Sequence, residues 1–202
     1  MPTRSRTSQE KRSATNGRSG YASSPAVREG RCCTTDLLPS GSLKNPVPTD
    51  IVDQLLEIAR WTGSSRNMQP WQFVVITDKE QLRQVSQVRP PINWVADAPL
   101  AIAIVLDGES TISEAYDEGR VSERLLIAAH VLGLGSGIAW FGDDVQQANA
   151  KAILGIPEER TARSVVVIGY ATTTKDHRPN PLTPGRKPIA ELVTYDRFGN
   201  KG

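Results

Sequence analysis

The chain has 202 residues, with 24 Lys or Arg against 22 Asp or Glu and a formal net charge of +2. That length suits one domain with a substantial core, or a smaller core preceded by a long arm. Residues 1–45 hold eight basic and three acidic side chains, whereas residues 46–202 hold sixteen and nineteen. Because the body is acidic and shows no basic cluster with aromatics between the cations, nucleic acid is excluded as an expected partner.

Residues 1–45 are predicted to be a disordered basic arm ahead of a folded domain at residues 46–202. The arm is rich in Ser, Thr, Arg and Gly and has few large apolar residues, so burial cannot offset the entropy lost on ordering. Cys32 and Cys33 are adjacent and would close no useful loop, and no spaced metal-ligand set is visible. With no secretory leader and no apolar stretch of membrane-spanning length, we expect a cytoplasmic protein that binds neither membrane nor metal.

The first half of the body predicts a helix, a polar loop, a strand and a second helix. Thr49 or Asp50 can cap a helix that runs to about residue 60 and carries apolar residues at helical spacing. A β-branched strand over 72–77 follows the loop. Asp78 can then cap a helix to about residue 87, which Pro90 breaks.

The second half predicts two more strands and two more helices. Leu100–Leu106 is almost purely apolar, which indicates a strand covered on both faces. A helix over about 113–133 has an apolar stripe suited to a central position, a shorter helix covers 143–154, and Ser164–Tyr170 is the last strand. Three apolar strands between helices of unequal length predict an α+β fold or a three-layer α/β/α sandwich around one sheet.

The loop Ser64–Trp71 carries the clearest functional signal. It offers two hydroxyls from Ser64 and Ser65 and two carboxamides from Asn67 and Gln69 at the mouth of a strand. Such a set suits a planar heteroaromatic ligand edged with donors and acceptors. The alternative is a capped connection whose polar groups satisfy only the backbone.

The glycine-rich run Gly133–Gly137 permits two further interpretations. It ends a predicted helix instead of following a strand, so it is not typical of a dinucleotide-binding fingerprint. We interpret it as a helix C-cap followed by a loop whose backbone approaches a ligand plane. A glycine-rich C-cap with buried aromatics after it is the alternative.

Five segments in order resemble the nitroreductase-like FMN-dependent oxidoreductases, over about residues 46–198. The segment Ser64–Trp71 matches the family's pattern P-S-S-x-N-x-Q-P-W, except that Gly63 stands where the family usually has proline. The five segments are Ser64–Trp71, Gly133–Trp140 (the "GLG" loop), Leu154–Glu158 ("LGIPE"), Ser164–Tyr170 (a late strand ending in "GY") and Gly185–Val193 ("RKP…ELV").

The resemblance implies a nitroreductase-like α+β fold, a mixed sheet flanked by helices, with FMN at the interface of a homodimer. Ser64, Ser65, Asn67 and Gln69 would then contact the ribityl chain and ring. Three further residues, Ile138, Trp140 and Phe141, would line the ring edge, and backbone amides of the glycine run could donate to it.

The FMN phosphate needs cations, and Arg186 and Lys187 are candidates, the alternative being a solvated charge pair. The family's Arg-Arg-Ser-x-Arg-x-Phe segment is absent. In its place only Arg31 has the right chemistry, and it lies too far from Pro46. This departure reflects either divergence or an N-terminus translated from another frame or start. Losing one or two such contacts would weaken FMN binding by one to several decades.

Hydride transfer at a flavin needs no protein nucleophile, metal or strong base, so we expect no catalytic side chain. The predicted function is an FMN-dependent NAD(P)H oxidoreductase. NADH or NADPH reduces the flavin and leaves, and a nitroaromatic, quinone or similar small acceptor follows in a ping-pong sequence. Two alternatives stay open: a non-catalytic flavin-binding or dimeric scaffold, and a specialised flavin-fragmenting or dehalogenating relative.

Overall fold

The computed structural model describes residues 45–170 and 187–200, all within the unit Cys33–Gly202. The predictions for the basic arm, Arg31 and Arg186 therefore lie outside the described residues. The helices are α2 (Thr49–Arg60), α3 (Lys79–Ser86), α4 (Thr111–Val131), α5 (Asp144–Leu154) and α6 (Ile189–Leu192), with short 3-10 segments η1 (Ser65–Asn67) and η2 (Pro90–Asp97). The strands are β1 (Trp71–Ile76), β2 (Leu100–Leu106), β3 (Gly135–Trp140) and β4 (Ser164–Gly169).

The four strands form one sheet in the order β1-β2-β4-β3. Every pairing within the described part of the chain is antiparallel, so the mixed sheet that we expected is not seen there. All seven residues of β2 are buried, which confirms the prediction of a strand covered on both faces. The free edges of this four-stranded sheet are β1 and β3.

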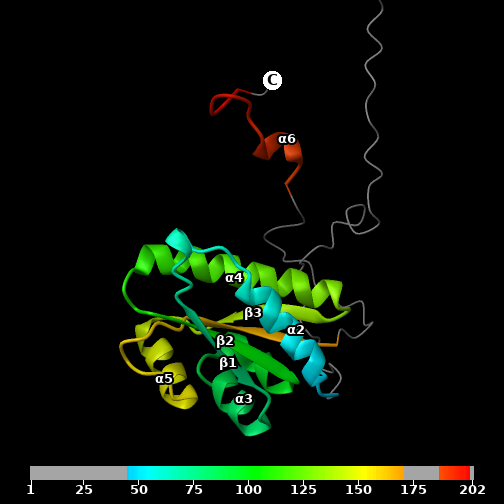
Figure 1. Ribbon diagram of the computed structural model, residues 1–202, viewed down its shortest axis with the longest axis vertical. Helices are drawn as coiled ribbons and strands as arrows, with labels where there is room; N and C mark the ends of the chain where they lie inside the picture. The colour runs from blue at the N-terminus through cyan, green and yellow to red at the C-terminus, as the bar shows by residue number, and fades with distance from the viewer. Residues whose placement is uncertain (1–44, 171–186, 201–202) are drawn as a thin grey trace, which may run out of the picture. The chain divides into compact units, whose positions relative to one another are not determined.

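Helices cover both faces of the sheet and make three layers (Figure 1). Alternate side chains of β2 point to opposite faces: Leu100, Ile102 and Ile104 join the core formed with α2 and α4. On the other face, Ala101 and Ala103 join the core formed with α3, η2 and α5. The predicted three-layer α+β class is confirmed.

Buried ionic contacts fix α4 to the start of β4. Glu118 accepts a hydrogen bond from the Ser164 hydroxyl at 2.7 Å and pairs with Arg163 at 3.0 Å. Glu114, also buried, lies 3.5 Å from the same guanidinium. Because a buried carboxylate without a partner is strongly destabilising, these contacts fix how α4 lies along the sheet.

The helix starts differ in part from the predictions. Asp78 accepts from the Gln81 amide at 2.8 Å and caps α3 as predicted. Asp143 forms a capping box with Gln146 at the start of α5. The predicted cap of α2 is wrong: Pro48 occupies the cap position, and neither Thr49 nor Asp50 serves as the cap.

The glycine run is only partly the predicted structure. Gly133 adopts φ 77° and the Leu134 amide donates to the Ala129 carbonyl at 2.8 Å, so the helix C-cap is confirmed. The expected loop after it is wrong, because Gly135–Trp140 forms the edge strand β3 and pairs along its length with β4. No helix in residues 45–170 or 187–200 is long and apolar enough to cross a membrane.

Candidate functional site

The loop between α2 and β1 has an unusual backbone. Arg66, Asn67 and Gln69 adopt φ values of 50°, 58° and 52°, a region that residues other than glycine rarely enter. The Ser64 hydroxyl accepts a hydrogen bond from the Gln69 amide at 2.8 Å and closes the loop. Non-glycine residues held in this conformation cluster at binding sites, so the loop qualifies as a candidate site on its geometry alone.

The side chains of this loop face solvent. Ser65, Arg66, Asn67 and Gln69 are exposed, whereas Ser64 is half-buried and shapes the loop. The Gln69 carboxamide donates weakly to the Asn67 carbonyl at 3.3 Å. A hydroxyl, a guanidinium and two carboxamides are therefore presented together, with most of their donors and acceptors uncommitted.

The sheet places this loop and the end of β3 at the same end of the molecule. Trp71, directly after the loop, pairs with Leu106, and a bridge joins Leu106 to Thr161. At the other edge, Trp140 pairs with Ser164. The two sets of predicted residues thus share one end of the sheet but lie on opposite edges. Three strand spacings, about 14 Å, separate them within one chain.

The three residues predicted to line the ring edge differ in solvent exposure. Ile138 is exposed, and Trp140 is 52% exposed while its ring stacks on the Arg89 guanidinium at 4.9 Å. Phe141 is fully buried in the core, and its amide donates to the Arg163 carbonyl at 2.9 Å. Ile138 and Trp140 therefore offer an apolar surface to a ligand, while Phe141 could offer only main-chain atoms.

The predicted phosphate-binding cations are only partly described. Lys187 is exposed at the start of the segment 187–200, and Arg31 and Arg186 lie outside the described residues. The structure adds Arg66, whose exposed guanidinium forms no ion pair within the described ranges. Sequence reasoning missed Arg66 because it occupies the variable position of the family pattern.

A hollow of about 310 Å³ lies beside the loop. Ser65, Arg66 and Met68 line one side, and acidic residues line the other. Those acidic residues are Asp107, Glu109, Glu114 and Asp117. Their charge makes this hollow unsuited to a phosphate dianion, so a phosphate would bind elsewhere.

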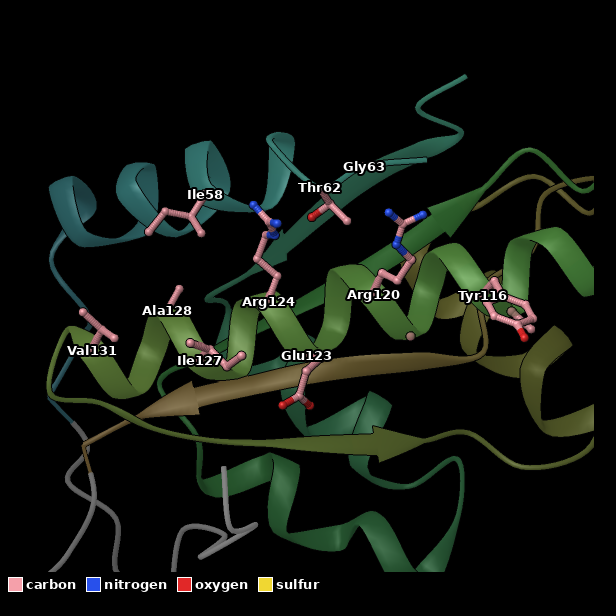
Figure 2. A pocket seen from close by; sticks show the side chains of 12 residues that line it. Ile58, Thr62, Gly63, Tyr116, Arg120, Glu123, Arg124, Ile127, Ala128 and Val131 are labelled. Carbon is pink, nitrogen blue, oxygen red and sulfur yellow. The ribbon is translucent and has the colours of Figure 1, made fainter. Parts of the chain in front are cut away.

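A larger groove of about 1010 Å³ lies between the end of α2 and the exposed side of α4 (Figure 2). Thr62 is buried at its α2 side, and its hydroxyl has no hydrogen-bond partner among the described residues. Arg120 approaches so closely that a Cβ on Gly63 would lie 2.7 Å from its Nη2. Sequence reasoning missed Thr62, whose isolation depends on how α2 packs on α4.

The last turn of α2 leads into the loop through a charged cluster. Hydrogen bonds from Arg60 and then from the Trp61 indole lower the pKa of Glu57 to about 2. Trp61 is itself exposed, with the Arg60 guanidinium 5.0 Å from its ring centre. The cluster fixes an exposed aromatic side chain three residues before Ser64.

The chemistry of these residues fits FMN. Hydroxyl and carboxamide groups complement the ring edge and the ribityl hydroxyls, and exposed Ile138 and Trp140 suit the ring's apolar part. Ser65, Asn67 and Gln69 are held exposed by a constrained backbone, so binding FMN would not incur the entropy cost of ordering a flexible loop. The described residues thus fit the ring and ribityl chain, while the phosphate depends on cations that are mostly outside them.

Comparisons with known proteins identify the family. A sequence model of the Nitroreductase family matches residues 43–104. A protein of Methanothermobacter thermautotrophicus, provisionally named an NADH dehydrogenase/NAD(P)H nitroreductase, is 32% identical over 132 residues, 61% of this chain and 67% of that protein. A protein of Archaeoglobus fulgidus with the same provisional name is 32% identical over 133 residues, 62% of this chain and 75% of that protein.

Solved structures extend the likeness to the fold. An FMN-dependent nitroreductase from Clostridium difficile R20291 has a TM-score of 0.68 and 25% identity, over 78% of this chain and 92% of that one. Bacillus megaterium NfrA2 has a TM-score of 0.71 over 86% of this chain and 74% of that one, and at 21% identity it shows the fold alone. The chain belongs to the Nitroreductase family. The predictions of family, fold and oxidoreductase class are confirmed.

Proposed function

We propose that this chain is an FMN-dependent NAD(P)H oxidoreductase that reduces small organic acceptors, such as nitroaromatics or quinones. NADH or NADPH binds and leaves oxidised, and the acceptor then binds in its place. When bound, FMN would supply the hydride-transfer chemistry between the nicotinamide and the acceptor. The protein supplies binding and orientation, and none of its side chains acts as a nucleophile.

The observation that carries this proposal is the constrained loop Ser64–Gln69. Its left-handed residues hold polar side chains outward, where they are accessible to a ligand or a second chain. Ser65, Asn67 and Gln69 would bind the ring and ribityl groups, while Ile138 and Trp140 would exclude water from the ring edge. Lys187, with Arg31 and Arg186, would neutralise the phosphate.

A homodimer is part of the proposal. Within one chain the loop and the Trp140 edge lie about 14 Å apart on opposite edges of the sheet, so one chain offers two half-sites. A twofold dimer would bring the loop of one chain to the β3 edge of the other. A cytoplasmic location remains a prediction.

Visible absorption and steady-state kinetics test the proposal directly. Purified protein titrated with FMN should give a perturbed flavin spectrum, and the complex should oxidise NADH or NADPH when a quinone or nitroaromatic is supplied. Plots of reciprocal rate against reciprocal donor concentration at several acceptor concentrations should be parallel, as two alternating half-reactions require. Protein that stays colourless and inert in excess FMN would refute the proposal.

A variant at Asn67 tests the role of the loop. Asn67→Gly removes the carboxamide but accepts the left-handed backbone, so the loop should keep its shape. Loss of one hydrogen bond to FMN should raise its Kd about tenfold. Asn149→Ala removes an exposed carboxamide from α5 and is the matched control, with no expected effect on FMN binding. Equal FMN affinity in the two variants would exclude Asn67 as a contact.

A further inference from the structure

Arg89 differs from the other half-buried arginines that the structure describes, because no carboxylate neutralises it. Arg160 pairs with Asp107, and Arg163 pairs with Glu118 at 3.0 Å. Arg89 is half-buried as well, yet it forms no ion pair within the described part of the chain. Because charged groups that leave bulk water are usually paired, this guanidinium is suited to bind an anion from outside the chain.

The backbone fixes Arg89 where its side chain reaches the end of β3. Pro90 follows it, and a residue before proline is held extended, as the Arg89 angles φ −156° and ψ 133° show. A Cβ added to Gly142 would lie 3.2 Å from the Arg89 Cδ. Gly142 also adopts φ 115°, which favours glycine. The arginine stem therefore lies close against the main chain that follows β3.

The guanidinium keeps one edge free for a ligand. Its Nη1 donates to the Trp140 carbonyl at 3.3 Å, and its Cζ lies 4.9 Å from the centre of the Trp140 ring. Nε and Nη2 form no hydrogen bond with any residue that the structure describes. These two atoms make up the edge that matches two oxygens of a carboxylate or a phosphate. Stacking on Trp140 orients this edge before a ligand binds, which lowers the entropy cost of binding.

The acidic side chains next to Gly142 in the sequence do not occupy this edge. Asp143 accepts a hydrogen bond from the Gln146 amide at 2.9 Å and caps α5. Asp144 is exposed, and neither carboxylate pairs with Arg89. The internal anions nearest along the chain thus leave the guanidinium available.

We propose that Arg89 and Trp140 form a subsite for the anionic group of a planar substrate, and that Arg89 determines specificity for that group. The inference rests on the proposed function, in which Ile138 and Trp140 line the edge of the flavin ring, and it names the substrate class which that site prefers. The aromatic part of the substrate would lie near the exposed Trp140 ring, with its carboxylate or phosphate on Nε and Nη2 of Arg89. The 2′-phosphate of NADPH and a carboxylate on the acceptor share this chemistry, and the experiment separates them.

Pairs of substrates that differ in one anionic group test the subsite in the presence of excess FMN. Two ratios of kcat/KM are measured, 4-nitrobenzoate over 4-nitrobenzamide and NADPH over NADH. Arg89→Met should lower one of the ratios at least about tenfold, as the loss of a charge-assisted contact requires, and the ratio that falls identifies the source of the anion. A general loss of structure lowers both members of a pair alike and leaves the ratio unchanged.

Two further variants separate charge from geometry. Arg89→Lys keeps the charge but loses the planar fork and the stacking, so the ratio should fall by an intermediate amount. Arg83→Met removes an exposed guanidinium that pairs with Glu80 on α3. It is the matched control, and both ratios should stay as in the original chain.

Anion binding is also measured without flavin or turnover. In a nitrogen-15 NMR titration of the protein alone, 4-nitrobenzoate or 2′-AMP should shift the Arg89 Nε–Hε signal, which is identified by its loss in Arg89→Met. Their uncharged counterparts, 4-nitrobenzamide and adenosine, should leave that signal in place.

The outcomes separate this inference from the proposed function. An active enzyme whose two ratios survive Arg89→Met would overturn the subsite and leave the oxidoreductase standing. A chain that is inert with FMN, but whose Arg89 signal shifts with one of the anions, would refute the oxidoreductase and support the subsite. An Arg89 signal that responds to neither anion, or equally to the uncharged counterparts, would also overturn the subsite.

Discussion

Removing the Arg163 guanidinium should destabilise the fold more than any surface charge does. Arg163 is the shared partner of Glu118 at 3.0 Å and Glu114 at 3.5 Å, and both side chains are nearly buried. Arg163→Met preserves most of the side chain's apolar bulk but leaves two carboxylates without their cation. Breaking a buried pair in this way costs about 3–5 kcal/mol of unfolding free energy. The lower end is expected here, since Glu118 keeps its 2.7 Å hydrogen bond from Ser164.

Urea denaturation followed by far-UV circular dichroism measures that change. A loss of about 3 kcal/mol should appear as a lower midpoint with an unchanged slope, and as a fall in Tm of roughly 6–12 °C. Arg160→Met is the matched control, because its pair with Asp107 is partly exposed and should contribute at most about 1 kcal/mol.

The double variant Arg163→Met/Glu118→Gln measures how strongly Arg163 and Glu118 are coupled in their contribution to the unfolding free energy. Replacing the anion as well should recover part of the loss, because one unpaired charge is removed. If Arg163→Met destabilises no more than Arg160→Met, the carboxylates are solvated, and the reasoning about how α4 is fixed to β4 is wrong.

Three further changes should have measurable effects. Arg60→Met should raise the pKa of Glu57 from about 2 toward 4.5 in a carbon-13 NMR titration; the stability that this carboxylate contributes is present above pH 4.5 and is lost as pH falls through about 2. In the same urea assay, Gly108→Ala should lower the unfolding free energy by more than about 2 kcal/mol, because φ is +87° and the added Cβ would lie 2.0 Å from the main-chain oxygen of Glu159. Gly155→Ala should lower it by only about 1 kcal/mol, because φ is +66° but the space around the added Cβ is open. Asp143→Ala removes the capping box of α5 and should lower the unfolding free energy by about 1 kcal/mol; an unchanged midpoint would show that the cap contributes nothing.

Most of the fold could be predicted from the sequence because its signals are local. The unbroken apolar run of β2 and the helical spacing in α4 each indicate one structure. The strand β3 was missed because Gly135, Ser136 and Gly137 show no apolar alternation. These residues become a strand only by pairing with β4, a contact distant in sequence. The prediction of the α2 cap was wrong because Pro48 already occupies the cap position, which leaves Asp50 inside the first turn.

The candidate site was predicted only as a set of residue types. The order of Ser64, Ser65, Asn67 and Gln69 revealed the loop, but its left-handed backbone could not be foreseen, since Arg66 and Gln69 are not residue types that usually signal that conformation. The unpartnered hydroxyl of Thr62 depends on how α2 packs against α4, which no short motif encodes. The roles of the ten predicted cofactor-binding residues stay predictions.

The strand order has a genetic consequence. The loop before Trp71 and the exposed side chain of Trp140 lie on opposite edges of the sheet, so the proposed twofold assembly builds each site from two polypeptides. A chain defective in the loop and a chain defective at the β3 edge, each inactive alone, should therefore complement when co-expressed. Random pairing makes half of the dimers mixed, and each mixed dimer has one intact site, so about a quarter of all sites should work.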